Sequence, residues 1–347
     1  MGSSQITNHA GAPGTRPGSA GETGRTPFKP HPWLRGGHLQ TIASFLLPRK
    51  IHLPPAEERL VEVAPGVKVR CWCLWQREAD RAQALTAIVV HGLEGSSDSQ
   101  YMTGVARNAL AAGMNVVLMN QRNCGGMDHF APTLYNSSLS GDVAAVARHV
   151  VENDGVKKFA LIGFSMGGNL VLKLAGEWGR EGPAQFRAVA AVCPAMDLAA
   201  SADALHLPGN RLYEFYFVWK LRRRLRDKSR LFPDVFDTSR LRGVKSLRDF
   251  DDKITAYYSG FEGAADYYAR AAASNAVDRI AVPALILHAA NDPFIRIVPE
   301  TRRKIVANAN IRFVETEDGG HCSFLGVRDG YDGYWAEQQV VNFLRAF

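Results

Sequence analysis

Cysteine is scarce in this sequence and long apolar runs are missing, and each absence narrows what the chain can be. The five cysteines form no Cys-x-x-Cys pair, so a zinc site of paired thiolates is not indicated. Cys71 and Cys73 alternate along a predicted strand and stand too close in sequence for an ordinary disulfide. We therefore expect reduced, buried thiols in a cytoplasmic protein, with neither a metal nor an organic cofactor.

No apolar run reaches about 18 residues, the length that crosses a bilayer, so no transmembrane segment is expected. The first residues also lack the basic-then-apolar order of a signal peptide. Weak peripheral contact with a membrane is the one membrane association that the sequence leaves open.

A strong overall excess of charge is absent too. The net charge is +7, from 41 basic and 34 acidic residues. Residues 211–248 hold 12 Lys/Arg and 4 Asp/Glu, so this one stretch carries the whole excess. Its aromatic and arginine side chains are Tyr213, Phe215, Tyr216, Phe217, Trp219, Arg222, Arg223, Arg224 and Arg226. Such a stretch suits an ordinary helix or an anionic lipid surface, whereas a nucleic-acid partner is not expected.

The order of segments predicts one α/β core with a tail and an insertion. Residues 1–26 are rich in Gly, Ser, Thr and Pro, so we predict a disordered tail. From Phe28 on, apolar strand patterns alternate with helical patterns. The stretch 197–280 breaks this alternation because it is helical, aromatic and basic. We predict a core of residues 27–196 and 281–347, with 197–280 inserted as a helical cap.

Eight segments have strand patterns, at 60–64, 67–75, 86–92, 115–120, 159–163, 188–193, 284–290 and 311–316. Most are apolar on both faces, and helical patterns stand between them. This is typical of a mostly parallel, twisted sheet of about eight strands with helices on both faces.

A candidate nucleophile stands where one strand meets a helix. Residues 163–167 read Gly-Phe-Ser-Met-Gly, directly after the strand pattern 159–163 and before a helical one. A sharp strand-to-helix turn lifts the serine above the sheet, and glycines on either side avoid clashes in that turn. The free N–H groups at the start of the helix then point towards the reacting centre. Ser165 is therefore the predicted nucleophile.

The predicted base is His321 and the predicted acid is Asp292. His321 lies in a Gly-rich loop after the strand pattern 311–316, and Asp292 follows the strand pattern 284–290. Their order after Ser165 is the one that a nucleophile turn of this kind requires. Asp197 is a rival acid, because it follows the strand pattern before the cap. Asp318 is interpreted as a turn residue.

An oxyanion hole needs two backbone N–H donors beside the nucleophile. One is predicted at Met166, the residue after Ser165, and the other at Leu93, in the loop after the strand pattern 86–92. His91, at the start of this loop, is interpreted as a structural histidine.

Seven longer motifs resemble the YheT-like branch of the α/β hydrolases. They are WLRGGHLQTI (33–42), HGLEGSSDSQY (91–101), NQRNCGG (120–126), GFSMGGN (163–169), FDDKITAYYSGFEGAADYY (250–268), HAANDPF (288–294) and GGHCSFLG (319–326). The resemblance implies the α/β-hydrolase fold, with the cap inserted before the strand that carries the acid. It also implies Ser165, Asp292 and His321 as the triad.

What the resemblance implies for function is hydrolysis of carboxylic esters, of a small or lipid-like acyl type, by an acyl-enzyme route. Two alternatives stay open: an acyltransferase that passes the acyl group to an alcohol, and a non-catalytic lipid-binding protein. The sequence does not indicate the acyl chain, the alcohol or the oligomeric state. Nor do residues 38–41, His-Leu-Gln-Thr, have a role that their side chains predict.

Overall fold

One twisted sheet organises the chain in a computed structural model that describes residues 27–76 and 81–347. The sheet has eight strands in the order β1-β2-β4-β3-β5-β6-β7-β8, which confirms the predicted sheet. Its strands are β1 (Glu57–Ala64), β2 (Val67–Leu74), β3 (Thr86–Val90), β4 (Asn115–Met119), β5 (Phe159–Phe164), β6 (Phe186–Val192), β7 (Ala284–Ala289) and β8 (Ile311–Thr316). The predicted disordered tail, residues 1–26, lies outside the described residues.

The apolar character of the strands decides which are central. From β4 to β8 all neighbouring strands pair in parallel, while β2 runs antiparallel to both β1 and β4. Strands β3, β4, β5 and β7 are buried at every residue, as their unbroken apolar runs require. The β1–β2 hairpin turns at Pro65-Gly66, where Gly66 has a φ of 69° that favours glycine.

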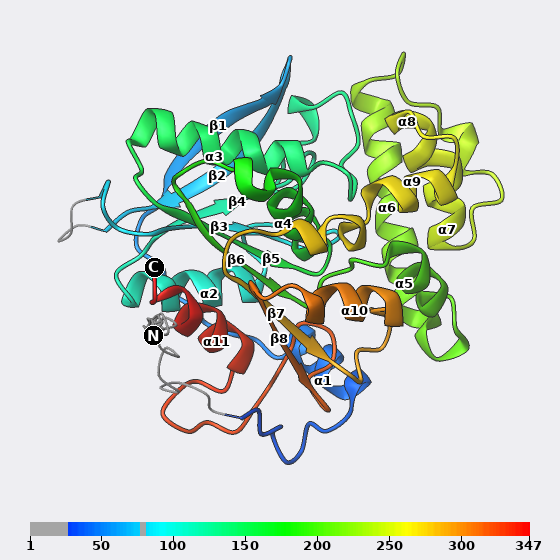
Figure 1. Cartoon of the computed structure of the whole chain (residues 1–347). Helices are drawn as coiled ribbons and strands as arrows, with labels where there is room; N and C mark the ends of the chain where they lie inside the picture. The colour runs from blue at the N-terminus through cyan, green and yellow to red at the C-terminus, as the bar shows by residue number, and fades with distance from the viewer. Residues whose placement is uncertain (1–26, 77–80) are drawn as a thin grey trace, which may run out of the picture.

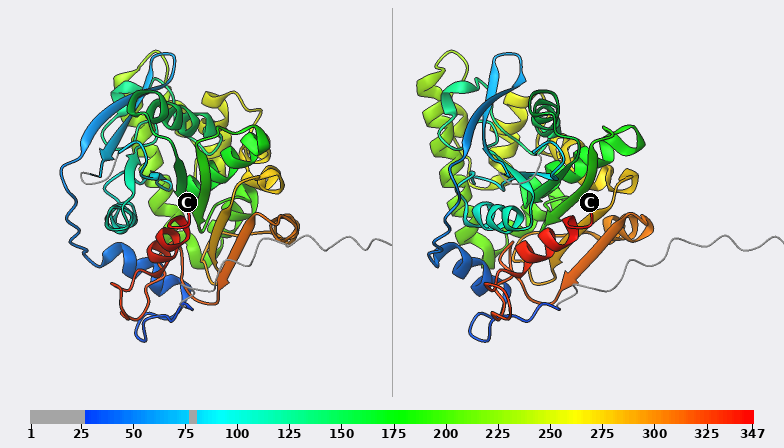
Figure 2. Two further views of the ribbon diagram at one scale, coloured as in Figure 1. Left: turned by 60° about the vertical axis from the view of Figure 1, so that its left-hand side comes forward. Right: turned by 90° about the vertical axis from the view of Figure 1, so that its left-hand side faces the viewer.

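Helices cover both faces of this sheet (Figure 1). The helices α3 and α4 pack on one face, and α2 and α11 pack together on the other. The helix α1 lies before the first strand, near the C-terminal part of the chain (Figure 2). A further helix, α10, stands between β7 and β8. The bounds of all these helices are α1 (Gly37–Leu46), α2 (Gln100–Ala111), α3 (Ser140–Asp154), α4 (Met166–Trp178), α10 (Pro299–Ala307) and α11 (Trp335–Leu344).

Between β6 and β7 the chain forms only helices and turns, and we call residues 197–280 the helical insertion. Its α-helices are α5 (Leu198–Leu205), α6 (Arg211–Leu231), α7 (Leu247–Phe250), α8 (Tyr257–Ser259) and α9 (Ala264–Ala271). A π-helical turn, Asp251–Ala256, joins α7 to α8. Most of the insertion has its own apolar clusters, whereas Ala273, Val277 and Ile280 pack into the main core. The insertion stands at the end of the sheet where α4 begins (Figure 1).

Candidate active site

Ser165 occupies the turn between β5 and α4, in a backbone conformation that few serines adopt. Its φ is 53° and its ψ is −117°. A Cβ atom at Gly163 would stand 2.2 Å from the carbonyl oxygen of Gly167, and one at Gly167 would stand 2.3 Å from that of Val90. Both neighbouring glycines are therefore required by close backbone approach, and the strained turn leaves the serine hydroxyl free to point away from the sheet.

His321 and Asp292 lie within hydrogen-bonding distance of this serine and of each other. Nε2 of His321 is 3.0 Å from Oγ of Ser165, and Nδ1 is 2.8 Å from Oδ2 of Asp292. The other oxygen of Asp292 accepts hydrogen bonds from the backbone N–H groups of Phe294 and Ile295. A carboxylate only accepts, so Nδ1 carries the ring proton when the histidine is neutral. Nε2 is then the acceptor that faces Ser165.

The electrostatic surroundings favour the charged forms of both Asp292 and His321. Burial disfavours the Asp292 carboxylate, but the His321 ring and the N–H of Ile295 outweigh burial and hold the pKa of Asp292 below its ordinary value. Burial likewise disfavours the His321 imidazolium, yet the Cys322 sulfur and the Asp292 carboxylate raise the pKa of His321 well above its ordinary value. The pair can therefore hold a proton that leaves the serine.

The two other carboxylates near this site have different partners. Asp197, the rival acid, accepts hydrogen bonds from the N–H of Val298 and the hydroxyl of Thr301, so it braces the start of α10. Asp318 accepts from the N–H of Gly36 and from the side chain of Asn291, as expected of a loop residue. Of these three carboxylates, Asp292 is the one that contacts His321.

The loop after β3 lies directly against the serine. A Cβ atom at Gly92 would stand 3.1 Å from Cβ of Ser165. His91 is fully buried beneath the loop; it accepts from the N–H of Gln121 at Nε2, and its Nδ1 lies 2.7 Å from the Gly92 carbonyl. Burial lowers the pKa of His91 to about 4, so this histidine is neutral and structural. The loop places Leu93 beside Met166 in the lining of one pocket with Ser165.

Helix α1 has a role that the sequence did not suggest, because Gln40 and Thr41 hold the loop of His321. The Thr41 hydroxyl accepts a hydrogen bond of 2.8 Å from the backbone N–H of His321. The fully buried Gln40 accepts from the N–H of Leu325 and donates to its carbonyl. The sequence signal was a Gln-Thr pair in a helix with several large apolar residues, but only the fold identifies its partner.

Cys322 is a second contact that sequence reasoning missed. Its sulfur lies 3.9 Å from Nε2 of His321, and its N–H donates to the sulfur of Cys193. Donor atoms of Cys193, His321 and Cys322 lie within 4.8 Å of one another, and so do those of Cys193, His288 and Asp292. We assign no metal to either group, because His321 and Asp292 already use these donor atoms in the bonds to Ser165 and to each other.

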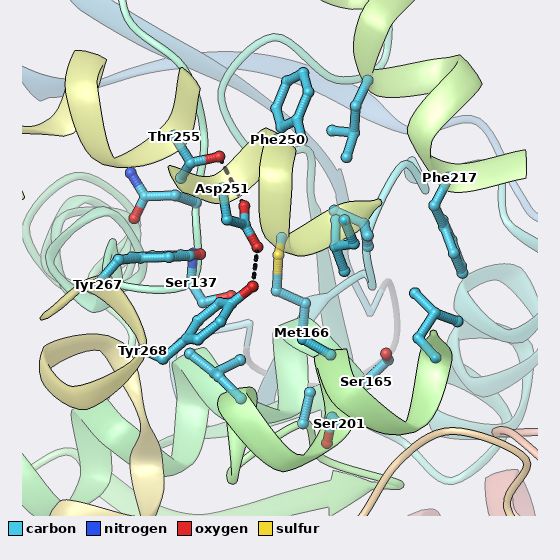
Figure 3. Close-up of a pocket in the computed structure, with 18 of the residues that line it drawn as sticks. Ser137, Ser165, Met166, Ser201, Phe217, Phe250, Asp251, Thr255, Tyr267 and Tyr268 are labelled. Atoms are coloured by element: carbon cyan, nitrogen blue, oxygen red, sulfur yellow. Dashed lines mark hydrogen bonds between the residues drawn. The ribbon is translucent and has the colours of Figure 1, made fainter. Parts of the chain in front are cut away.

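A pocket between the core and the helical insertion reaches Ser165 (Figure 3). Apolar side chains make up most of its wall, among them Leu93, Met166, Ala195, Leu198, Leu205, Phe217, Leu221, Leu247, Phe294 and Ile295. Farther along, Asp251 accepts hydrogen bonds of 2.8 Å from Thr255 and from Tyr268. Burial raises the pKa of Asp251 to about 6. The pocket therefore offers room for an apolar group beside the serine and a polar region beyond it.

Comparison with known proteins agrees with this architecture. Residues 88–326 match the profile of a family described as the alpha/beta hydrolase fold. This match spans the nucleophile turn, the helical insertion and the His321 loop. The chain belongs to the α/β hydrolase family.

Among the relatives of this α/β hydrolase is YheT of Escherichia coli (strain K12), which is named as a candidate esterase. It is 30% identical over 317 residues, which are 89% of this chain and 90% of YheT. The phospholipase ABHD3 of Mus musculus is 27% identical over 90% of this chain and 75% of its own length. The predicted resemblance to the YheT-like branch is confirmed.

A solved structure supports the fold of this α/β hydrolase. The esterase Pf2001 of Pyrococcus furiosus superposes with a TM-score of 0.54 over 86% of this chain and 98% of its own. At 16% sequence identity, this likeness shows the shared fold alone.

Proposed function

We propose that the chain is a serine hydrolase of carboxylic esters, with Ser165 as nucleophile, His321 as base and Asp292 as the acid that orients it. The observation that carries the proposal is the pair of contacts through one imidazole, 3.0 Å to the serine and 2.8 Å to the aspartate. Such a linked arrangement activates a serine on several unrelated folds. The names of the relatives, an esterase and a phospholipase, support the same class of reaction.

The first half of the reaction forms an acyl-enzyme. Nε2 of His321 takes the serine proton while Oγ attacks the ester carbonyl, and Asp292 stabilises the imidazolium that results. The backbone N–H groups of Leu93 and Met166 would bind the oxyanion; among the described residues, neither has a hydrogen bond to another element. The carbon–oxygen bond to the alcohol then breaks, and His321 returns its proton to the departing alcohol.

The second half releases the acyl group as an acid. His321 removes a proton from water, which attacks the acyl carbonyl; the bond to Oγ of Ser165 then breaks as His321 returns this proton to Oγ. The apolar wall beside the serine suits an aliphatic acyl chain rather than a charged one. An alcohol in place of water would yield a new ester by the same steps.

Labelling with a fluorophosphonate probe tests this proposal, alongside hydrolysis of nitrophenyl esters with short and long acyl chains. Wild type should be labelled and should turn over, and Ser165→Ala should lose labelling and about 10⁵-fold or more of kcat/KM. Ser229→Ala, on α6 and outside the pocket lining, is the matched control and should behave as wild type. Folded wild type that neither labels nor turns over would overturn the proposal, and so would turnover that survives Ser165→Ala.

A further inference from the structure

Helix α1 has its apolar side turned outwards. Leu39, Ile42, Phe45 and Leu46 are 46%, 36%, 65% and 67% exposed, while Gly37, Gln40 and Ala43 are buried. The spacing of three and four residues puts the exposed side chains on one stripe of the helix. A surface helix normally buries such a stripe, so this face is suited to a partner outside the described fold.

Helix α6 continues the same kind of surface and adds positive charge. Leu212, Phe215 and Trp219 are 71%, 70% and 48% exposed. Helical spacing carries this face on to Arg223, Arg226 and Arg230, all of which are exposed. Asp227 is the acid among them, and it pairs with Arg223 and Arg230. The outer face of α6 therefore changes from apolar to cationic along its length.

Only two of the four arginines named from the sequence, Arg223 and Arg226, face outwards. Arg224 pairs with Glu94 and Asp128 of the core, and Arg222 donates to the carbonyl of Val244. Arg224 is largely buried as a result, so it belongs to the packed side of the helix and not to the outward face. A helix of 3.6 residues per turn cannot present Arg223 and Arg224 to the same side.

The two helices touch, and a series of aromatic contacts joins them to the active site. The rings of Phe45 and Tyr216 lie 5.8 Å apart, and His38 stacks on Tyr213. The Tyr213 ring lies 5.3 Å from that of Phe294, which in turn lies 4.4 Å from the His321 ring. The exposed face is thus continuous with the wall of the site.

We propose that this face docks on the surface of an anionic phospholipid bilayer and presents the pocket to esters held there. We call it the docking surface, made of Leu39, Ile42, Phe45, Leu46, Leu212, Phe215, Trp219, Arg223, Arg226 and Arg230. Its apolar part suits the interface between headgroups and acyl chains, and its arginines suit lipid phosphates. This inference rests on the proposed function and adds to it that the ester substrate is held in a bilayer.

Two other occupants fit the surface less well. At a two-fold interface a second copy would present this same surface, and the acid that α6 carries there, Asp227, is already paired with Arg223 and Arg230. The N-terminal residues 1–26 contain no aromatic residue and only Met1 and Ile6 as large apolar ones, so they offer little to cover it. A bilayer supplies both the apolar layer and the negative charge.

Binding is measured in the Ser165→Ala background, so that hydrolysis does not alter the lipid, by co-sedimentation with vesicles. Vesicles of phosphatidylcholine mixed with phosphatidylglycerol should bind more protein than phosphatidylcholine alone. Phe45→Ser with Phe215→Ser should weaken binding about tenfold or more. Arg223→Gln with Arg226→Gln should remove the preference for anionic vesicles. Leu60→Ser, at an exposed apolar residue on the edge strand β1 and outside the docking surface, is the control and should bind normally.

Three results would overturn the proposal. The first is that the protein does not bind vesicles, and the second is that the Phe45/Phe215 variant binds them as well as the parent protein. The third is that sedimentation velocity shows a dimer which this variant dissociates, with no binding to vesicles. With Ser165 restored, the Phe45/Phe215 variant should hydrolyse a soluble short-chain ester normally, which shows that it folds. Vesicle binding by a protein without esterase activity would leave this inference standing and remove the proposed function instead.

Discussion

At the scale of single residues, the proton affinity of His321 is set by its immediate neighbours. Asp292 holds Nδ1 at 2.8 Å, and the Cys322 sulfur lies 3.9 Å from Nε2, on the side that faces Ser165. Burial disfavours the Cys322 thiolate, but Cys193 and His321 outweigh it and lower the pKa of Cys322. A sulfur with negative charge beside the ring stabilises the imidazolium, so Cys322 bears on the pH range in which His321 is a free base.

The pH profile of kcat/KM for a soluble nitrophenyl ester should therefore depend on Cys322. The base must be neutral, so activity is lost as pH falls through the pKa of His321, which is raised in the wild type. Cys322→Ser removes the thiolate, lowers this pKa and should shift the acid limb to lower pH. Cys73→Ser, at a buried cysteine on β2, should leave the limb in place. Coincident profiles for wild type and Cys322→Ser would contradict this account.

At the scale of elements, α1 and the His321 loop act as a unit although they come from opposite ends of the chain. Thr41 bonds the backbone of His321, and Gln40 bonds that of Leu325. A Cβ atom at Gly320 would stand 2.5 Å from the Gly37 carbonyl, so loop and helix are in direct backbone contact. The outward apolar stripe of α1 and its inward polar pair thus serve different purposes on two faces of one helix.

Thr41→Val should lower kcat about tenfold with little change in KM, since the isosteric valine removes the acceptor for the His321 N–H. Rates are normalised to the sites that a fluorophosphonate labels, which separates misplacement of the base from loss of folded protein. Thr41→Ser keeps the hydroxyl and should restore most of kcat. Full activity per labelled site in Thr41→Val would show that the bond does not position the base.

At the scale of the whole molecule, the helical insertion and the core are joined by buried charge. Arg224 of α6 lies 2.8 Å from Glu94, the residue after Leu93 in the loop beside Ser165. Burial disfavours the Glu94 carboxylate, but Arg224 outweighs burial and holds the pKa of Glu94 below its ordinary value of 4.5. Because this pair joins the insertion to the loop beside Ser165, contact with a membrane through the docking surface would bring the insertion and the pocket to the membrane together.

No helix among residues 27–76 and 81–347 is long and apolar enough to span a bilayer.

Glu94→Gln should lower the free energy of unfolding by about 3 kcal/mol at neutral pH, because it leaves a buried guanidinium without its main partner. Since the folded-state pKa of Glu94 is depressed, its contribution is present above 4.5 and is lost as pH falls through the folded value. Denaturant unfolding should thus show a smaller difference from wild type at acidic pH. Asp227→Asn, in an exposed pair with Arg230, should cost less than about 1 kcal/mol. Equal effects of the two variants would contradict the assigned role of Glu94.

The sequence by itself predicted the parts of the protein that local physics governs. Unbroken apolar runs indicated the buried parallel strands, and Gly163 and Gly167 around Ser165 indicated a turn that backbone contact makes obligatory. The order of Ser165, Asp292 and His321 along the chain led to the arrangement that the structure brings into contact. The strands and the turn can be predicted from the sequence because they depend on residues that are neighbours along the chain or on burial.

Only the tertiary structure decided which distant groups meet. It placed Asp292 at His321 and Asp197 at the start of α10, although both follow strands that end at the same edge of the sheet. It turned the apolar stripe of α1 outwards, although the pattern alone is typical of a buried face. Partners separated by hundreds of residues, such as Thr41 and His321, are set by which elements pack together, and periodicity shows that a face packs but not against which element.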